Sequence, residues 1–220
     1  REEMTLTGRS SAKKSKPRTS PRRFSIGRGS KYNYIVQISI LQTKLTPPRL
    51  QRTTLARPRL TACLREALDY RVTLVHASAG YGKSTALANL AQEHAPLYWY
   101  SASEGDADAQ QFLAHLTAAF QTRTDFPDAP LAFLQEHGAT RATMDALLNA
   151  LNDFLRAPTL FVIDDYHLAA SPDVNALTDY FLDFLPATLH VIVATRYPPQ
   201  WEHLPTWRAR GQLQEIKRDT

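Results

Sequence analysis

Short, mostly apolar runs alternate with stretches of helical periodicity along the last three quarters of this chain. Runs of strand length occur at 72–76, 97–101, 159–163, 189–195 and 212–216. Continuous apolar strands are typical of a parallel sheet that is buried on both faces. Because strands and helices alternate, the pattern predicts right-handed crossovers and an α/β fold. We expect a mostly parallel five-stranded sheet flanked by helices.

Helices are expected between these strands, where good helix formers carry apolar residues at helical spacing. The predicted ranges are 61–70, a helix from about 83, 109–122, 142–156 and 172–184, with short helices after Pro130. Ser171 and Pro172 have the residue types that begin a helix. We interpret Asp106 or Asp108 as a helix N-cap rather than as a ligand.

The first 60 residues differ in charge from the rest. Fifteen of the 26 Lys and Arg residues precede residue 61, whereas 19 of the 21 Asp and Glu residues follow residue 60. The net charge of +5 therefore describes the N-terminal region and is weak support for a DNA-binding core. Residues 34–60 are predicted to be an extended lead-in, because their prolines prevent a continuous helix.

Residues 1–33 are rich in Ser, Lys, Arg, Gly and Pro and predict a disordered basic arm. Two interpretations remain open. The arm either binds nucleic acid or is a solvated tail or sequence upstream of the natural start. Arg1, in place of an initiating Met, favours the second.

Several classes of protein are disfavoured. Cys63 is the single cysteine, so an internal disulfide is impossible and a reducing cytoplasm fits; we expect Cys63 to be a small core residue. No apolar stretch is long enough for a membrane span, and no signal peptide is evident. The seven histidines lack the spacing of zinc ligands.

The most informative local pattern follows the strand at 72–76. A loop containing Gly80 and Gly82 leads into Lys83-Ser84 at the start of a helix, which is the layout of a Walker A phosphate-binding loop. Loop N–H groups and the helix N-terminus favour phosphate. Lys83 is predicted to reach the β- and γ-phosphates, and Ser84 to hold Mg²⁺. The predicted nucleotide-contacting residues are Ala79, Gly80, Tyr81, Gly82, Lys83, Ser84 and Thr85.

Charged residues end two of the other predicted strands. Asp164 and Asp165 follow the strand at 159–163, at the edge where parallel sheets bind ligands. Asp164 is predicted to hold Mg²⁺ through water, and Asp165 to orient or deprotonate the attacking water. Arg196 follows the strand at 189–195. It either senses the γ-phosphate or pairs with one of the two carboxylates.

Together these residues resemble the N-terminal nucleotide-binding domain of the MalT-like, or large LuxR-type, bacterial transcriptional regulators. These are STAND-class ATPases related to AAA-type P-loop ATPases. The resemblance covers about residues 41–216 and is carried by segments 43–49, 57–60, 77–85, 164–167, 194–196 and 208–213. Ala77 stands where the general Walker A pattern has its first Gly, and Ala is usual at that position in this family.

The resemblance implies a cytoplasmic nucleotide switch spanning residues 61–220. It would hold ADP at rest and would bind ATP with Mg²⁺, hydrolyse it slowly and self-associate when active. Arg57 resembles an Arg that contacts nucleotide. The family's winged-helix, sensor and helix-turn-helix domains, through which inducer and promoter DNA act, are not among these 220 residues. The alternative is a related STAND or AAA-type ATPase whose output is not DNA binding, such as a signalling scaffold.

Overall fold

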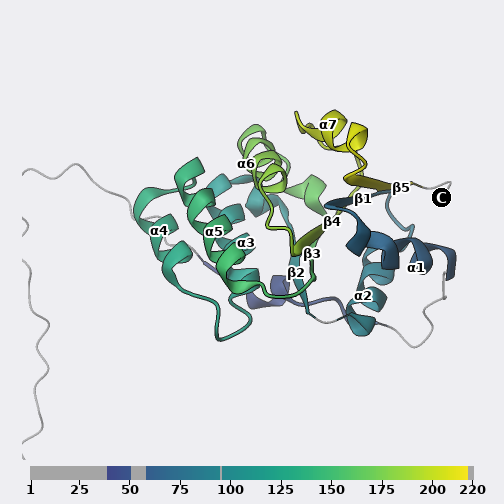
Figure 1. Ribbon diagram of the computed structural model, residues 1–220, viewed down its shortest axis with the longest axis horizontal. Helices are drawn as coiled ribbons and strands as arrows, with labels where there is room; N and C mark the ends of the chain where they lie inside the picture. The colour runs from purple at the N-terminus through teal and green to yellow at the C-terminus, as the bar shows by residue number, and fades with distance from the viewer. Residues whose placement is uncertain (1–38, 51–57, 95, 218–220) are drawn as a thin grey trace, which may run out of the picture. The chain divides into compact units, whose positions relative to one another are not determined.

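The computed structural model describes residues 39–50, 58–94 and 96–217, and these residues fold around a single sheet (Figure 1). The predicted arm at 1–33 and Arg57 lie outside the described residues. Within the described ranges, no helix combines the length and the apolar character needed to cross a membrane.

Among the residues that the structure describes, the sheet has five strands, and every neighbouring pair is parallel. The strands are β1 (Val72–His76), β2 (Leu97–Ser101), β3 (Thr159–Asp164), β4 (Leu189–Thr195) and β5 (Leu213–Ile216). Their order across the sheet is β2-β3-β4-β1-β5. The predicted α/β fold is therefore confirmed.

Helices precede β1 and connect the strands. They are α1 (Pro58–Arg65), α2 (Lys83–Glu93), α3 (Ala109–Phe120), α4 (Ala129–His137), α5 (Arg141–Phe154), α6 (Pro172–Asp183) and α7 (Leu204–Ala209). The 3-10 turns among the described residues are η1 (Gln42–Leu45), η2 (Glu66–Asp69), η3 (Glu104–Ala107) and η4 (Tyr166–Leu168). Two caps form as predicted: Asp108 accepts a hydrogen bond from the N–H of Gln111, and Ser171 from that of Val174.

The alternation of side chains along each strand builds two apolar cores, one on each face of the sheet. On β3, Phe161 and Ile163 pack with the buried residues of α3, α5 and α6, whereas Leu160 and Val162 pack with those of α1 and α2. Figure 1 shows these two groups of helices on opposite sides of the sheet. Cys63 is partly buried against the second core, as its apolar surroundings predict.

The structure differs from the predicted elements mainly before β1. Residues 42–45 form the 3-10 turn η1 rather than extended chain, and α1 begins at Pro58, inside the predicted lead-in. Proline is tolerated in the first turn of a helix, because the N–H that it lacks would have no helical partner there. The short helix α7 was not predicted.

Candidate functional site

Three strands end side by side and bring the sequence-predicted residues to one edge of the sheet. His76, the last residue of β1, is paired with Thr195, the last residue of β4. The N–H of Ala77 donates to the carbonyl of Thr195 at 3.4 Å. Asp164 ends β3, the other neighbour of β4. This is the carboxyl edge of the sheet, where open parallel sheets bind their ligands.

The loop between β1 and α2 needs glycine at two positions. Gly80 has φ +80° and Gly82 has φ +71°, in the left-handed region that disfavours side chains. Gly82 is also the N-cap of α2, and its carbonyl accepts from the N–H of Ala86 at 2.9 Å. A Cβ at Gly80 would meet nothing within 4 Å. The loop backbone is therefore open to a ligand while the helix behind it is hydrogen-bonded.

We expect Gly82→Ala to weaken ATP binding about fivefold, because the left-handed conformation costs a side chain about 1 kcal/mol and the loop relaxes away from it. Titration with fluorescent ATP measures the change. Gly138→Ala is the matched control, since Gly138 has the same φ of +71° at the C-cap of α4 and an added Cβ would meet nothing within 4 Å. Equal losses in the two variants would contradict a specific role for the Gly82 conformation.

Lys83, the first residue of α2, is buried beneath this loop. Its side chain leaves the residue only 7% exposed, and Nζ donates to the carbonyls of Ala77 at 2.6 Å and Ser78 at 3.1 Å. Burial lowers the pKa of Lys83, and the charges of Asp165 and Asp164 oppose that shift. Lys83 is thus a cation held at the loop by backbone carbonyls and facing two carboxylates across the site.

Asp164 is the most perturbed acid at this edge. It is 3% exposed, and Oδ1 accepts from the N–H of Asp165 at 3.0 Å. Burial raises the pKa of Asp164 to about 6; a hydrogen bond from Ser84 and the charge of Lys83 only partly oppose this, and the charge of Asp165 adds to it. The carboxylate therefore lacks full compensation for its burial.

The oxygen atoms at this point suit a hard cation. The hydroxyl of Ser84 and the carboxylate of Asp164 come together from α2 and β3. Mg²⁺ prefers oxygen ligands and commonly takes only one or two from protein, with the remainder from water and phosphate. The incomplete compensation of Asp164 is the local observation that fits Mg²⁺ binding.

Asp165 adopts the left-handed conformation with φ 52°, the one non-glycine positive φ within the described ranges. Asp adopts this conformation more readily than most residues, and conformations of this kind cluster at functional sites. The next turn, η4, starts from this residue. The backbone reversal places the second carboxylate at the site and turns the chain toward His167.

Arg196 and His167 complete the polar surroundings of the site. The charge of Arg196 acts on both Lys83 and His167 and lowers the pKa of each, after the larger effect of burial. Within the part of the chain that the structure describes, Arg196 is not within ion-pair distance of Asp164 or Asp165. Of the two predicted alternatives for Arg196, the ion pair therefore does not form, and the γ-phosphate contact stays a prediction.

His167 was given no role by the sequence pattern. Its side chain is 6% exposed, and neither ring nitrogen has a hydrogen-bond partner among the described residues; Nδ1 lies 4.0 Å from Oδ1 of Asp165. It lines a cavity of about 270 Å³ together with Thr195 and Tyr197. A polar residue two positions after the acidic pair, in an otherwise apolar turn, was the signal available in the sequence.

Residues 67–194, more than half of the chain, match the AAA domain family. The chain belongs to this family. The matched region contains β1 to β3, β4 without its last residue, the glycine loop and both carboxylates. It is thus a P-loop ATPase domain of the AAA type, as its sequence motifs predicted.

This AAA domain is also similar to the transcriptional regulator MalT. It is 34% identical to MalT of Yersinia pestis (strain Pestoides F) over 181 residues, covering 80% of this chain and 20% of that protein. MalT of Cronobacter sakazakii is 34% identical over 180 residues, with the same two shares covered. The chain spans about a fifth of the length of these curated relatives.

One solved structure that resembles the AAA domain is a Walker-type ATPase of Pyrococcus abyssi. The two chains share 20% sequence identity, with a TM-score of 0.48. The match covers 68% of this chain and 47% of the Pyrococcus chain. That score is too low to add to the assignment, which rests on the family match and on the MalT relatives.

Proposed function

We propose that this chain is the ATP-binding switch domain of a cytoplasmic MalT-like transcriptional regulator. The observation that carries the proposal is the arrangement of Lys83 at the glycine loop opposite Asp164 and Asp165, whose charges act on it across the carboxyl edge of the sheet. An AAA domain with these residues is equipped to hold a nucleoside triphosphate with Mg²⁺.

The N-terminal half of the site binds phosphate in this proposal. Backbone N–H groups between Ala79 and Thr85 surround the phosphates, and the N-terminus of α2 adds a favourable dipole. Lys83 exchanges its carbonyl partners for β- and γ-phosphate oxygens. Arg57 and Arg196 contribute further positive charge toward the nucleotide.

The acidic half of the site supports slow hydrolysis. Ser84 and Asp164 would hold Mg²⁺, which would supply positive charge near the phosphate oxygens. Asp165 accepts a hydrogen bond from the attacking water and orients it. An arginine from a neighbouring subunit would complete the site by stabilising the charge of the transition state. Hydrolysis would then depend on self-association, as expected of a nucleotide switch.

Regulation follows from the difference between ATP and ADP. The ADP form is the resting state, and the ATP form self-associates. Because the chain spans about a fifth of its MalT relatives, we propose that inducer and promoter DNA act through regions that these 220 residues do not include.

Sedimentation velocity tests the switch. We expect the chain to sediment faster with Mg²⁺ and saturating ATP than with ADP, because only the γ-phosphate distinguishes the two states. Lys83→Ala is expected to sediment alike with either nucleotide. Identical profiles for the wild type in ATP and ADP, at concentrations shown to saturate it, would contradict a nucleotide-controlled assembly.

A further inference from the structure

A buried polar cluster lies beside β2, at the far end of the sheet from β5. It consists of Lys44 in η1, Ser103 and Asp106 around η3, and His115 in α3. Lys44 Nζ is 2.6 Å from Oδ2 of Asp106 and donates to the hydroxyl of Ser103 at 2.7 Å. His115 Nδ1 lies 2.9 Å from the other oxygen of Asp106. The side chain of Asp106 is fully buried, and that of Lys44 is 18% exposed.

Asp106 is ionised in this cluster. Burial alone would raise its pKa, but hydrogen bonds from His115, Lys44 and the backbone of Ser103 hold the pKa well below the usual range. A buried carboxylate is retained only where its partners satisfy it, and removing one of them leaves an uncompensated charge. Lys44 is thus part of the reason that this charge is tolerated.

The residues around the cluster also bind the segment 39–45, which precedes the region that matches the AAA family. The N–H of Leu41 donates to Nε2 of His115 at 3.1 Å, while Nδ1 of the same ring lies 2.9 Å from Oδ1 of Asp106 and 3.2 Å from the side-chain nitrogen of Gln111. The side-chain amide of Gln111 donates to the carbonyl of Ser39 at 2.6 Å. These contacts explain why residues 42–45 form a docked turn and not a free extended segment.

Backbone hydrogen bonds connect the cluster to the candidate site. Oδ2 of Asp106 accepts from the N–H of Ser103 at 2.7 Å, which fixes the residue after Ala102. Ala102 in turn donates its N–H to the carbonyl of Asp164 at 2.8 Å. Ser101, the last residue of β2, is paired with Asp164 in the sheet. The turn that Lys44 holds is therefore bonded directly to the acidic end of β3.

A second series of contacts, between aromatic rings, leads from the cluster to η4. The ring of Tyr100 stacks on His115 with centroids 5.7 Å apart and contacts Phe112 at 5.6 Å. Phe112 meets the edge of Tyr166 at 6.2 Å. Tyr166 stands between Asp165 and His167 in η4. The backbone hydrogen bonds thus reach Asp164, and the aromatic contacts reach Tyr166, the residue after Asp165.

We propose that Lys44 is a positioning residue for the end of β3 that would bind Mg²⁺: by bridging Asp106 and Ser103 it holds the β2 turn, and through it Asp164, in place. The proposal rests on the proposed function and names a residue outside the phosphate loop. It predicts that loss of Lys44 weakens the response to Mg²⁺ rather than nucleotide binding as such.

The test compares ATP affinity with and without Mg²⁺ in Lys44→Met and in Lys44→Met/Asp106→Asn. The double variant has no unpaired buried carboxylate, so it carries the test if Lys44→Met does not fold. Arg65→Met is the matched control, because Arg65 forms an ion pair with Glu93 at 2.8 Å in which both side chains are exposed to solvent. Each variant is first shown to be folded by circular dichroism.

We expect both Lys44 variants to lose about tenfold of the Mg²⁺ enhancement of ATP affinity, since a misplacement of about 1 Å can cost about a hundredfold and a smaller displacement costs less. Mg²⁺-free affinity should stay within about twofold of wild type. A double variant with the full wild-type enhancement would overturn the proposal and leave the cluster a structural role. Mg²⁺-free affinity falling in parallel would overturn it as well.

The failure of the proposed function gives a different result. In that case wild type and Lys83→Ala would bind ATP equally, or not at all, whatever the state of Lys44. Binding that depends on Lys83 but not on Lys44 would overturn only the positioning role.

Discussion

Replacement of Lys83 by Ala is expected to lower the affinity for both ATP and ADP about a hundredfold. The ammonium group is the buried cation at the glycine loop, held by the carbonyls of Ala77 and Ser78. Losing about 3 kcal/mol, the upper end for a hydrogen bond to a charged group, corresponds to this factor. Titration of fluorescent ATP and ADP measures it.

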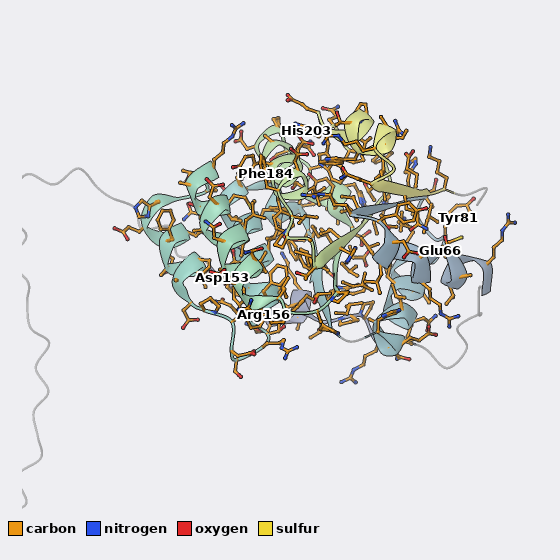
Figure 2. All side chains as sticks on the ribbon, in the orientation of Figure 1. Glu66, Tyr81, Asp153, Arg156, Phe184 and His203 are labelled. Carbon is orange, nitrogen blue, oxygen red and sulfur yellow. The ribbon has the colours of Figure 1, made fainter. Side chains whose placement is uncertain are left out.

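The carbonyls that Lys83 now contacts belong to partly exposed residues, so water can replace the amine and the variant should fold. Arg156→Ala removes the same charge from an exposed residue just before β3, at the opposite edge of the sheet. Figure 2 shows Arg156 far from Tyr81, the labelled residue of the loop. Unchanged affinity in a folded Lys83→Ala protein, or an equal loss in Arg156→Ala, would contradict the loop assignment.

Asp164→Asn should make the nucleotide-free protein more stable while it weakens the response to Mg²⁺. Burial raises the pKa of Asp164 from 3.8 to about 6, so at pH 7 the ionised form destabilises the folded chain. A shift of about two pKa units corresponds to on the order of 2 kcal/mol after allowing for the polar partners that Asn keeps. Urea unfolding at pH 7 without Mg²⁺ measures this gain.

The gain must depend on pH. Because the folded-state pKa lies above the unfolded value, the contribution of Asp164 to stability is fully present below about pH 4 and is lost as the pH rises through 6. The wild type and Asp164→Asn are therefore expected to be equally stable near pH 4 and to diverge up to pH 7. A constant difference across this range would show that the pKa of Asp164 is not raised.

The response to Mg²⁺ should run the other way. Ionised Asp164 is the form that attracts the cation, so the Mg²⁺ enhancement of ATP affinity in the wild type should grow from pH 5 to pH 7 and be small in Asp164→Asn. Asp153→Asn, on the exposed side of α5 away from the loop (Figure 2), is the control for charge loss. An Asp164→Asn variant with the full Mg²⁺ enhancement would exclude this carboxylate from the metal site.

The strands and the phosphate loop could be predicted because their signals are local. β1, β2 and β4 lie where the apolar runs predict them. The side chains of β3 alternate between the two apolar cores, so β3 also occurs in the sequence as a continuous apolar run. Gly82 and Lys83 are adjacent in sequence, so the turn and the helix start that follows it are encoded within a few residues.

Features that depend on distant partners could not be predicted. Lys44 and Asp106 are 62 residues apart, and nothing near either residue indicates the ion pair. The docked turn η1 depends on the same cluster. Because the local sequence does not indicate that cluster, it predicts an extended lead-in instead. Likewise, Asp106 was interpreted only as a cap: its capping box with Ser103 forms, but the contacts with Lys44 and His115 are tertiary.

The strand order is also a tertiary property. Alternating strands and helices indicate a parallel sheet, but not that β4 lies between β3 and β1. That order places Thr195 and Arg196 between the glycine loop and the acidic pair. His167 gained its place at the site for a similar reason, since only the left-handed turn at Asp165 brings η4 back to the sheet edge.

Titration of fluorescent ATP into the wild-type chain, with and without Mg²⁺, tests the central claim most directly. The account predicts saturable one-to-one binding that ADP displaces and that Mg²⁺ strengthens for ATP. A folded chain that shows no saturable binding, or binding that Mg²⁺ leaves unchanged, would contradict the claim that Lys83, Ser84 and Asp164 form a working nucleotide site.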